Sequence, residues 1–218
     1  MTGWILFGTF FVLVFLNVPI AVSLGLSTLI GLLVSGVDFS MFPSIMYSSV
    51  GKFALLAIPF FILAGTIMDY AGISKRLVRL AQVCVGHTKS GMLAVVVIVA
   101  CFFAAISGSG PATVAALGAI LIPALTDVGY DKGTATALMS ASGGIGIVIP
   151  PSIAFVVYAS VTDVSVGRLF AGGFIPGILV GVAFFLAAKF ASRNNPNVKQ
   201  MPKASAKERW DALKDAIW

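Results

Sequence analysis

The chain has 218 residues, of which 59% are hydrophobic and only 10% are charged. Soluble domains carry about a quarter charged residues, so this composition excludes an ordinary soluble protein and predicts an all-α polytopic membrane protein. The net charge of +6 comes from basic residues in the loops and terminal segments, and it does not indicate nucleic-acid binding. Cys84 and Cys101 lack metal-like spacing and are expected to be small packing residues.

Residues 3–36 form the first apolar stretch, which Asn17-Val18-Pro19 interrupts. A straight helix of this length would measure roughly 51 Å, longer than an ordinary span of about 30 Å. Two short helices folded at residues 17–19 therefore fit better than one kinked helix. The stretch has no basic residues before it and no cleavage pattern after it, so it does not resemble a signal peptide.

Residues 52–70 form the next span, with Pro59 inside it, and residues 73–86 form an amphipathic helix. We expect Ser74 to cap this helix. One face is apolar and the basic residues point elsewhere, which predicts a helix along the membrane surface. The apolar face comprises Ile73, Leu77, Leu80, Ala81, Cys84 and Val85, and the basic residues are Lys75, Arg76 and Arg79.

Residues 91–107 and 112–126 are two apolar segments joined by Ser107-Gly108-Ser109-Gly110-Pro111, here called the tip. Each segment gives only about 24 Å of helix, too short for a full crossing. The pair predicts a re-entrant hairpin that enters and leaves the membrane on the same side.

Residues 133–142 and 152–162 flank Gly143-Gly-Ile-Gly-Ile-Val-Ile-Pro-Pro151, here called the break. Each segment is too short to span the membrane, but together they fit one discontinuous helix. Unpaired backbone groups at membrane depth are tolerated only beside protein or a polar cavity. Interrupted apolar segments are typical of the binding sites of secondary transporters.

Residues 166–190 form a last span, in which Gly177 and Gly181 have the spacing that permits close helix contact. A basic linker, residues 193–204, follows. Ser205 and Glu208 then form a capping box that opens a short amphipathic helix. Its apolar face carries Trp210, Leu213 and Ile217.

The basic residues predict the orientation, because loops rich in Lys and Arg remain cytoplasmic. Lys52 and Arg168 lie on one side. The other 12 of the 14 Lys and Arg residues lie at 75, 76, 79, 89 and 132, and at 189, 193, 199, 203, 207, 209 and 214. The hairpin mouth, the amphipathic helix and the C-terminal tail are therefore expected to face the cytoplasm. If residues 3–36 cross twice, the N-terminus lies outside.

The tip and the break together suggest an ion site. Glycine lets backbone carbonyls converge, and the helix ends that meet there supply partial charges. The helix after the tip directs its N-terminus toward an anion, whereas the C-terminal carbonyls of residues 91–107 and 133–142 suit sodium. The sodium candidates are Ser107, Ser109, Ser142 and Gly144. The alternative interpretation is that glycine and proline merely kink packed helices.

The runs Ile106–Gly118, Ser142–Ser152 and Ser165–Gly177 resemble the large membrane (M) subunit of tripartite ATP-independent periplasmic (TRAP) transporters. The resemblance covers essentially the whole chain. It implies sodium-coupled uptake of organic acids, such as C4-dicarboxylates or sialic acids, by an elevator movement in the bacterial inner membrane. It also implies a small membrane (Q) subunit and a periplasmic substrate-binding (P) protein as partners, membrane lipid around the chain, and Na⁺ as coupling ion without a cofactor.

By this resemblance the tip matches the family's first hairpin and the break its first discontinuous helix. The substrate- and ion-binding candidates are Ser107, Gly108, Ser109, Gly110, Pro111, Thr113, Ser142, Gly143, Gly144, Gly146, Val148, Pro150 and Pro151. The family has a second hairpin and a second broken helix in inverted orientation, whereas this sequence has one of each. It resembles one repeat, the N-terminal half, of an inverted-repeat elevator-type transporter. The C-terminal half is therefore expected either from a partner polypeptide or from a longer chain.

The predicted organisation has four parts. Residues 1–90 are scaffold helices with the amphipathic arm 73–86, and residues 91–162 are part of a transport domain, with the hairpin at 91–127 and the broken helix at 131–162. Residues 163–192 are a transmembrane helix, and residues 193–218 are a cytoplasmic linker and amphipathic helix. We expect the arm to be static and residues 91–162 to move as a unit.

The sequence also bears on two other functions, an intramembrane protease and an ion channel. An intramembrane protease is not expected, because neither the Gly-x-Ser-Gly nor the Gly-x-Gly-Asp motif is present and the single histidine, His87, lies beside the basic arm. The alternative to a transporter is an ion channel or pore subunit that uses the hairpin as a filter. A broken helix after the hairpin favours a carrier.

Overall fold

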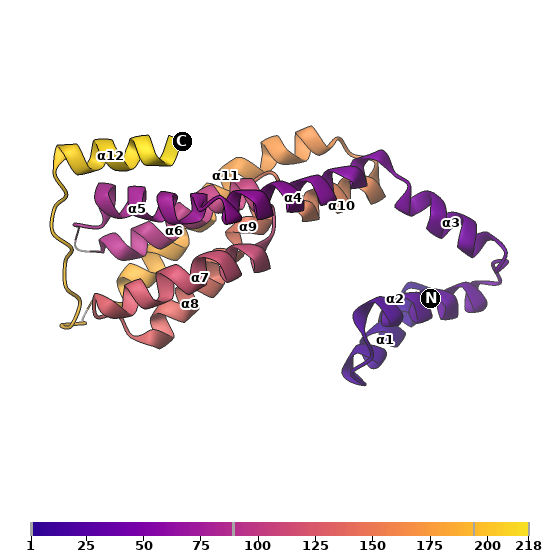
Figure 1. The fold of residues 1–218 in the computed structure, drawn as a ribbon. Coiled ribbons are helices and arrows are strands. Elements are labelled where there is room, and N and C mark those ends of the chain that lie inside the picture. The colour runs from indigo at the N-terminus through magenta and orange to yellow at the C-terminus, as the bar shows by residue number, and fades with distance from the viewer. Residues whose placement is uncertain (1, 89, 194, 218) are drawn as a thin grey trace. The chain divides into compact units, whose positions relative to one another are not determined.

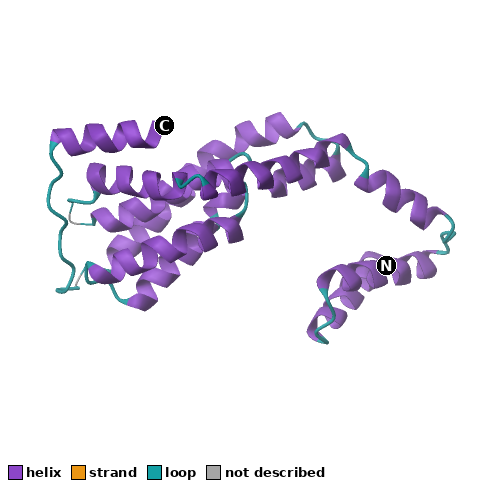
Figure 2. Cartoon of the chain, in the orientation of Figure 1, coloured by secondary structure: helices purple, strands orange, loops and turns teal. Residues whose placement is uncertain are grey.

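The computed structural model describes residues 2–88, 90–193 and 195–217, and every regular element among them is a helix (Figures 1 and 2). Four of the described helical segments are long and apolar enough to cross a membrane: Phe53–Tyr70, Gly110–Asp127, Lys132–Thr162 and Val166–Ala191. The prediction of an all-α, multi-span chain is confirmed at this level. Residues 1–52 and 53–218 form two compact units, which are described separately.

The first unit contains α1 (Thr2–Phe15), α2 (Ile20–Ser35) and α3 (Met41–Val50). The predicted fold at residues 17–19 is confirmed, and Asn17 turns the chain with φ +62°. Small buried residues at every fourth position of α2 (Ser23, Ser27 and Gly31) let α1 approach closely. A Cβ atom on Gly31 would lie 3.5 Å from Leu6 Cδ1.

The helix α3 is the element of this unit that sequence analysis did not predict. It contains Pro43, which usually breaks a helix. Here Pro43 lies in the first turn, where a missing N–H removes no intrahelical hydrogen bond. The helix is therefore compatible with its proline.

The second unit begins with a 3₁₀ turn, η1 (Phe53–Leu56), followed by α4 (Ala57–Tyr70) and α5 (Ile73–Val85). The expectation that Ser74 caps α5 is wrong. Gly72, with φ +76°, occupies the N-cap position, and the Ser74 hydroxyl instead donates to Asp69 Oδ1 of α4 at 2.6 Å.

The predicted apolar face of α5 is confirmed in part, because Ala81 is buried and Leu77 and Val85 pack against the core. Ser74 and Val78 are buried as well, whereas Cys84 is exposed and is not the packing residue that was expected. Val78 and Ala81 belong to the hydrophobic core of this unit, in which α5 packs on α6.

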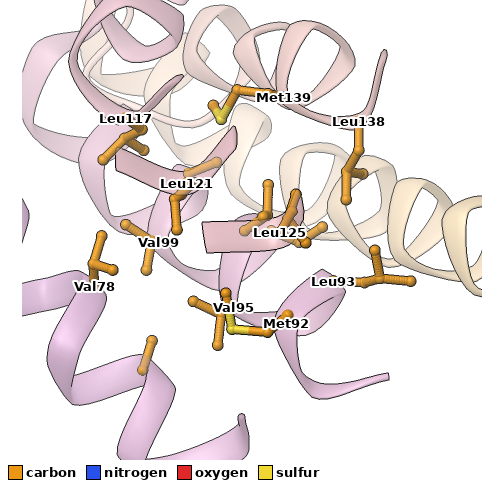
Figure 3. Packing of buried hydrophobic residues seen from close by; sticks show 14 of the residues in the cluster. Val78, Met92, Leu93, Val95, Val99, Leu117, Leu121, Leu125, Leu138 and Met139 are labelled. Atoms are coloured by element: carbon orange, nitrogen blue, oxygen red, sulfur yellow. The ribbon is translucent and has the colours of Figure 1, made fainter. Parts of the chain in front are cut away.

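The core of the second unit is built around α6 (Gly91–Ser107). Its neighbours are α7 (Gly110–Asp127) and α8 (Lys132–Gly143), whose inward side chains interdigitate with those of α6 (Figure 3). Leu93 of α6, Leu121 of α7 and Met139 of α8 are each completely buried. Close packing of this kind holds apolar helices together, since lipid supplies little hydrophobic driving force between them.

The helix α11 (Val166–Ala191) lies against the core through a line of glycines. A Cβ atom on Gly173 would lie 2.6 Å from the Val148 carbonyl oxygen, and one on Gly177 would overlap Ile149. At Gly181 the nearest atom would be Cys101 Sγ, at 3.2 Å. The predicted close contact at Gly177 and Gly181 is thereby confirmed, and Cys101 is a packing residue as expected.

The last helix, α12 (Ala206–Ile217), packs on α5. Its predicted capping box is confirmed: Ser205 N donates to Glu208 Oε2 at 2.7 Å, and Glu208 N donates to Ser205 Oγ at 3.2 Å. The hydrogen bond from the Ser205 backbone lowers the pKa of the Glu208 carboxyl. Arg76 Nη1 donates to the Asp215 carbonyl at 3.1 Å.

Candidate functional site

The tip forms where α6 ends and α7 begins. Gly108, with φ +61°, closes α6 by donating its N–H to the Ala104 carbonyl at 3.0 Å. Ser109 is the N-cap of α7 and accepts a hydrogen bond from Ala112 N at 3.4 Å. Pro111 lies in the first turn, where helices tolerate proline. The hairpin turn therefore lies where the sequence predicted, although α7 starts two residues earlier, at Gly110.

Hydroxyl groups cross the tip from one helix to the other. Ser107 Oγ lies 3.2 Å from Thr113 Oγ1, and Thr113 Oγ1 donates to the Ser109 carbonyl at 2.8 Å. Ser107 is 5% exposed and Thr113 is fully buried. The tip is thus a small buried polar cluster inside apolar helices.

The break is not a single irregular segment. After α8 ends at Gly143, one helical turn, α9 (Ile145–Val148), precedes the extended residues Ile149 to Ser152. Ser152 then caps α10 (Ile153–Thr162) by accepting from Phe155 N at 3.4 Å. The predicted discontinuous helix is confirmed, with an additional turn at α9 that the glycine-rich sequence did not suggest.

The tip and the break lie in direct backbone contact. Ile153 N donates to the Gly108 carbonyl at 3.2 Å. A Cβ atom on Gly110 would lie 2.7 Å from the Gly143 carbonyl oxygen, and one on Gly146 would lie 3.2 Å from the Ser109 carbonyl oxygen. The contact therefore depends on glycine, because any side chain would push the two backbones apart.

For three further predicted site residues, Gly144, Val148 and Pro150, the structure shows no hydrogen bond to the tip. A Cβ atom on Gly144 would meet only Ala141 O of its own helix, at 3.1 Å, and no atom of the tip within 4 Å. The carbonyl of Val148 lies against Gly173 of α11. Pro150 is buried and is joined to Pro151 by a cis peptide bond, and the Pro151 carbonyl lies against Gly108.

Ser142 immediately precedes the break, and its hydroxyl is completely buried without a hydrogen-bond partner. An unpaired buried hydroxyl costs about 1–3 kcal/mol, so such groups usually mark a ligand or a functional role. Among the described residues there is no group of His, Cys, Asp or Glu that could hold a metal ion. The polar side chains of the tip and of Ser142 are hydroxyls, and the Asp69 carboxylate of α4 lies in the cavity beside the tip.

A cavity of about 620 Å³ opens beside the tip, between α4 and the start of α7. Ser107 and Ser109 line it from the tip, and Thr66, Asp69 and Tyr70 line it from α4. Sequence analysis missed the α4 side. The available signal was the spacing of Thr66, Asp69 and Tyr70, which places three polar-headed side chains on one face of an apolar helix.

A helical hairpin in backbone contact with a discontinuous helix, among apolar helices long enough to cross a membrane, is typical of secondary-transporter subunits. Comparison with known families matches residues 7–218 to "Tripartite ATP-independent periplasmic transporter, DctM component". The chain belongs to this family. The predicted family is thereby confirmed.

Individual relatives agree. The C4-dicarboxylate TRAP transporter large permease protein DctM of Vibrio cholerae is 44% identical over 93% of this chain and 45% of its own length. The isethionate TRAP transporter permease protein DctMQ of Oleidesulfovibrio alaskensis is 40% identical over 98% of this chain and 34% of its own. The 2,3-diketo-L-gulonate TRAP transporter large permease protein YiaN of Escherichia coli is 35% identical over 83% of this chain and 42% of its own length.

The chain therefore spans about half the length of the curated relatives it matches, or less. It is related to a transporter permease rather than to an enzyme, and the comparisons give no support to the channel alternative.

Proposed function

We propose that this chain forms the N-terminal half of a sodium-coupled transport unit for small organic anions. The observation that carries the proposal is the contact between tip and break, beside which the Ser142 hydroxyl is buried without a partner. A hydrated cation can give up its water only where several oxygens replace it. Neutral hydroxyl and carbonyl oxygens next to glycine provide such a replacement for Na⁺.

The proposed sodium ligands are the hydroxyls of Ser142 and Ser107, together with backbone carbonyls of the tip and the break. Ser109 has a smaller role because its side chain already caps α7. Gly144 can contribute only its carbonyl, which already accepts a hydrogen bond from Ile147 N at 3.2 Å.

The proposed substrate position is the 620 Å³ cavity beside the tip, which has the volume of a small-molecule site. The N-terminus of α7 points at the tip and carries partial positive charge, which favours an anionic group there. Asp69 places a carboxylate on the α4 side, so the substrate's anionic group should face the tip rather than α4. The relatives named for C4-dicarboxylate, isethionate and 2,3-diketo-L-gulonate support a small organic anion as the class.

The proposed arrangement in the membrane follows the basic residues. The hairpin α6–α7 is re-entrant from the cytoplasm, and the chain lies in the bacterial inner membrane with a small Q subunit, a periplasmic binding protein and a second, C-terminal half. The fused name DctMQ of one relative supports association with a Q subunit. Movement of the hairpin and broken helix against the scaffold remains the proposed elevator step.

The test is uptake of radiolabelled succinate, a C4-dicarboxylate, by vesicles containing the assembled transporter and its binding protein. We expect uptake to require an inward sodium gradient, and Ser142→Ala to raise the sodium concentration for half-maximal uptake. Uptake that continues unchanged without sodium, with a proton gradient present, would overturn the sodium assignment. Ser27→Ala, a buried serine on α2 bonded to its own helix, is the matched control.

A further inference from the structure

A second polar cavity, of about 240 Å³, lies at the end of α11, and neither the tip nor the break contributes to it. Its walls come from separate parts of the second unit. They are Ser90 before α6, Tyr130 between α7 and α8, Lys189, Ser192 and Arg193 at the end of α11, and Asn195, Val198 and Gln200 of the linker. Its lining includes Lys189 and Arg193, whereas the cavity beside the tip is lined by no Lys or Arg among the described residues. We call this second cavity the linker cavity.

The chemistry of the linker cavity suits an anion. Two cations, Lys189 and Arg193, line it together with hydroxyl and carboxamide groups that donate hydrogen bonds. None of the described lining residues is Asp or Glu. The nearest carboxylate in sequence, Asp131, is engaged elsewhere, because it accepts from Thr134 N at 3.1 Å as the N-cap of α8.

The cavity is held in shape by hydrogen bonds between the linker and the α7–α8 turn. Lys199 N donates to the Val128 carbonyl at 2.8 Å, and Asn195 Nδ2 donates to the Gly129 carbonyl at 3.2 Å. Tyr130, only 5% exposed, provides a fixed wall. The backbone frame of the cavity and Tyr130 are therefore fixed, and the exposed side chains of Lys189 and Arg193 lie at its edge.

Both cations lie beside aromatic rings at the end of a helix that is long and apolar enough to cross a membrane. Arg193 Cζ is 4.2 Å from the centre of the Phe190 ring, and Lys189 Nζ is 5.9 Å from that of Phe185. Leu186 and Phe190, one helical turn apart, are 55% and 65% exposed. This end of α11 thus offers an apolar strip for acyl chains directly next to a cationic cavity for a headgroup.

We propose that the linker cavity binds the phosphate group of an anionic phospholipid from the cytoplasmic leaflet. Basic pockets at the cytoplasmic ends of membrane helices are suited to such headgroups. Arg193 supplies a planar fork for the phosphate oxygens and Lys189 a point charge. Bound there, the phosphate contacts the hairpin mouth, the end of α11 and the linker at once, so the lipid stabilises their junction.

The test measures thermal unfolding of the purified, assembled transporter in neutral detergent with added phosphatidylglycerol. Phosphatidylcholine with the same acyl chains, glycerol 1-phosphate and inorganic phosphate are compared in parallel. We expect phosphatidylglycerol well above its Kd to raise the unfolding midpoint by about 5 °C. Phosphatidylcholine should give little change, and the two soluble phosphates should act only weakly because they lack acyl chains.

The paired variant is Lys189→Gln with Arg193→Gln, which should lose the phosphatidylglycerol-specific rise. Its control is Lys207→Gln with Lys214→Gln, which removes the same charge from exposed positions of α12 and should keep the rise. If both double variants lose the rise equally, the rise comes from general surface charge, and the proposed site is overturned. An equal rise with inorganic phosphate would overturn the lipid assignment in favour of free phosphate.

A charge-preserving variant covers the case in which the double neutral variant does not fold. Lys189→Arg with Arg193→Lys keeps both cations and should retain most of the rise. Complete loss with this variant, in a protein that unfolds at the parent midpoint without lipid, would contradict a site based on charge.

Discussion

The α1–α2 pair and the junction of tip and break both use small residues inside apolar helices, but for different purposes. In α2, the hydroxyls of Ser23 and Ser27 donate to carbonyls of the preceding turn, at 3.2 and 3.0 Å. At the junction, the Ser107 and Thr113 hydroxyls lie together across the tip, and that of Ser142 has no partner. Small buried serines therefore indicate a site only where their hydrogen-bonding capacity is not used by their own helix.

The glycines of the two regions differ in the same way. A Cβ atom on Gly3, Gly8 or Gly25 would meet nothing within 4 Å, whereas one on Gly110 or Gly143 would meet the backbone of the other segment. These three glycines of the first region could therefore accept a methyl group. In the second region glycine is required by contact between two backbones.

The largest contrast should appear in membrane topology. With exposed Cys84 first replaced by serine, cysteines at Ser90 and Thr126 should both react with an impermeant maleimide added from the cytoplasm, because α6 and α7 form a re-entrant hairpin. In the α1–α2 pair, Thr2 and Val37 should react from one side and Val18 from the other. Labelling of positions 90 and 126 from opposite faces would contradict the hairpin.

The next contrast compares Gly110→Ala with Gly25→Ala. A methyl group at position 110 meets the Gly143 carbonyl, displaces both backbones and should weaken sodium binding by about tenfold or more, near 1.4 kcal/mol. At Gly25 the space is open, and alanine should raise stability by up to about 1 kcal/mol through helix propensity alone. Sodium titration of uptake, normalised to protein, measures the first effect and thermal unfolding the second.

Gly144→Ala provides an internal check on that comparison. The sequence alone groups Gly144 with Gly110, yet a methyl group at position 144 would meet only its own helix, so this substitution should affect sodium binding less. An equal loss at positions 110 and 144 would show that local helix geometry, and not contact between tip and break, controls the site.

Ser142→Ala should separate binding from folding. Without sodium, removing the unpaired hydroxyl should leave stability unchanged or raise it by about 1 kcal/mol, since an unmet hydrogen bond disappears. With sodium, the stabilisation seen in the parent should be reduced several-fold. Thermal unfolding across a sodium series measures both. If Ser142→Ala unfolds earlier without sodium and responds normally to sodium, the serine is structural.

The smallest effect is expected for Ser109→Ala. This side chain caps α7, so its loss should lower stability by about 1 kcal/mol, equally with and without sodium. Ser152→Ala removes the cap of α10 and also the hydrogen bond from the buried Ser152 hydroxyl to the Ile147 carbonyl, so it should lower stability more than Ser109→Ala does. A loss at Ser109 that depends on sodium would instead place its hydroxyl among the ligands.

Most of the helices could be predicted from the sequence because their signals are local. The charge-free runs indicate apolar helices, Asn17 to Pro19 indicates a turn, and Ser205 with Glu208 indicates a helix start. The positions of the tip and the break follow from glycine and proline, which disfavour continuous helix wherever they occur. The family resemblance rests on these same runs.

What the tertiary structure alone decided concerns contacts between distant segments. Which residues of α5 are buried, with Ser74 and Val78 inside and Cys84 exposed, depends on the helices that pack against it. The pairing of Gly110 with Gly143, the place of Asp69 beside the tip and the unpaired state of Ser142 depend on which backbone lies opposite. Local composition specifies where a helix must stop, because backbone conformation is a property of a few neighbouring residues. Only packing determines what each interruption meets, because that depends on every helix in the unit at once.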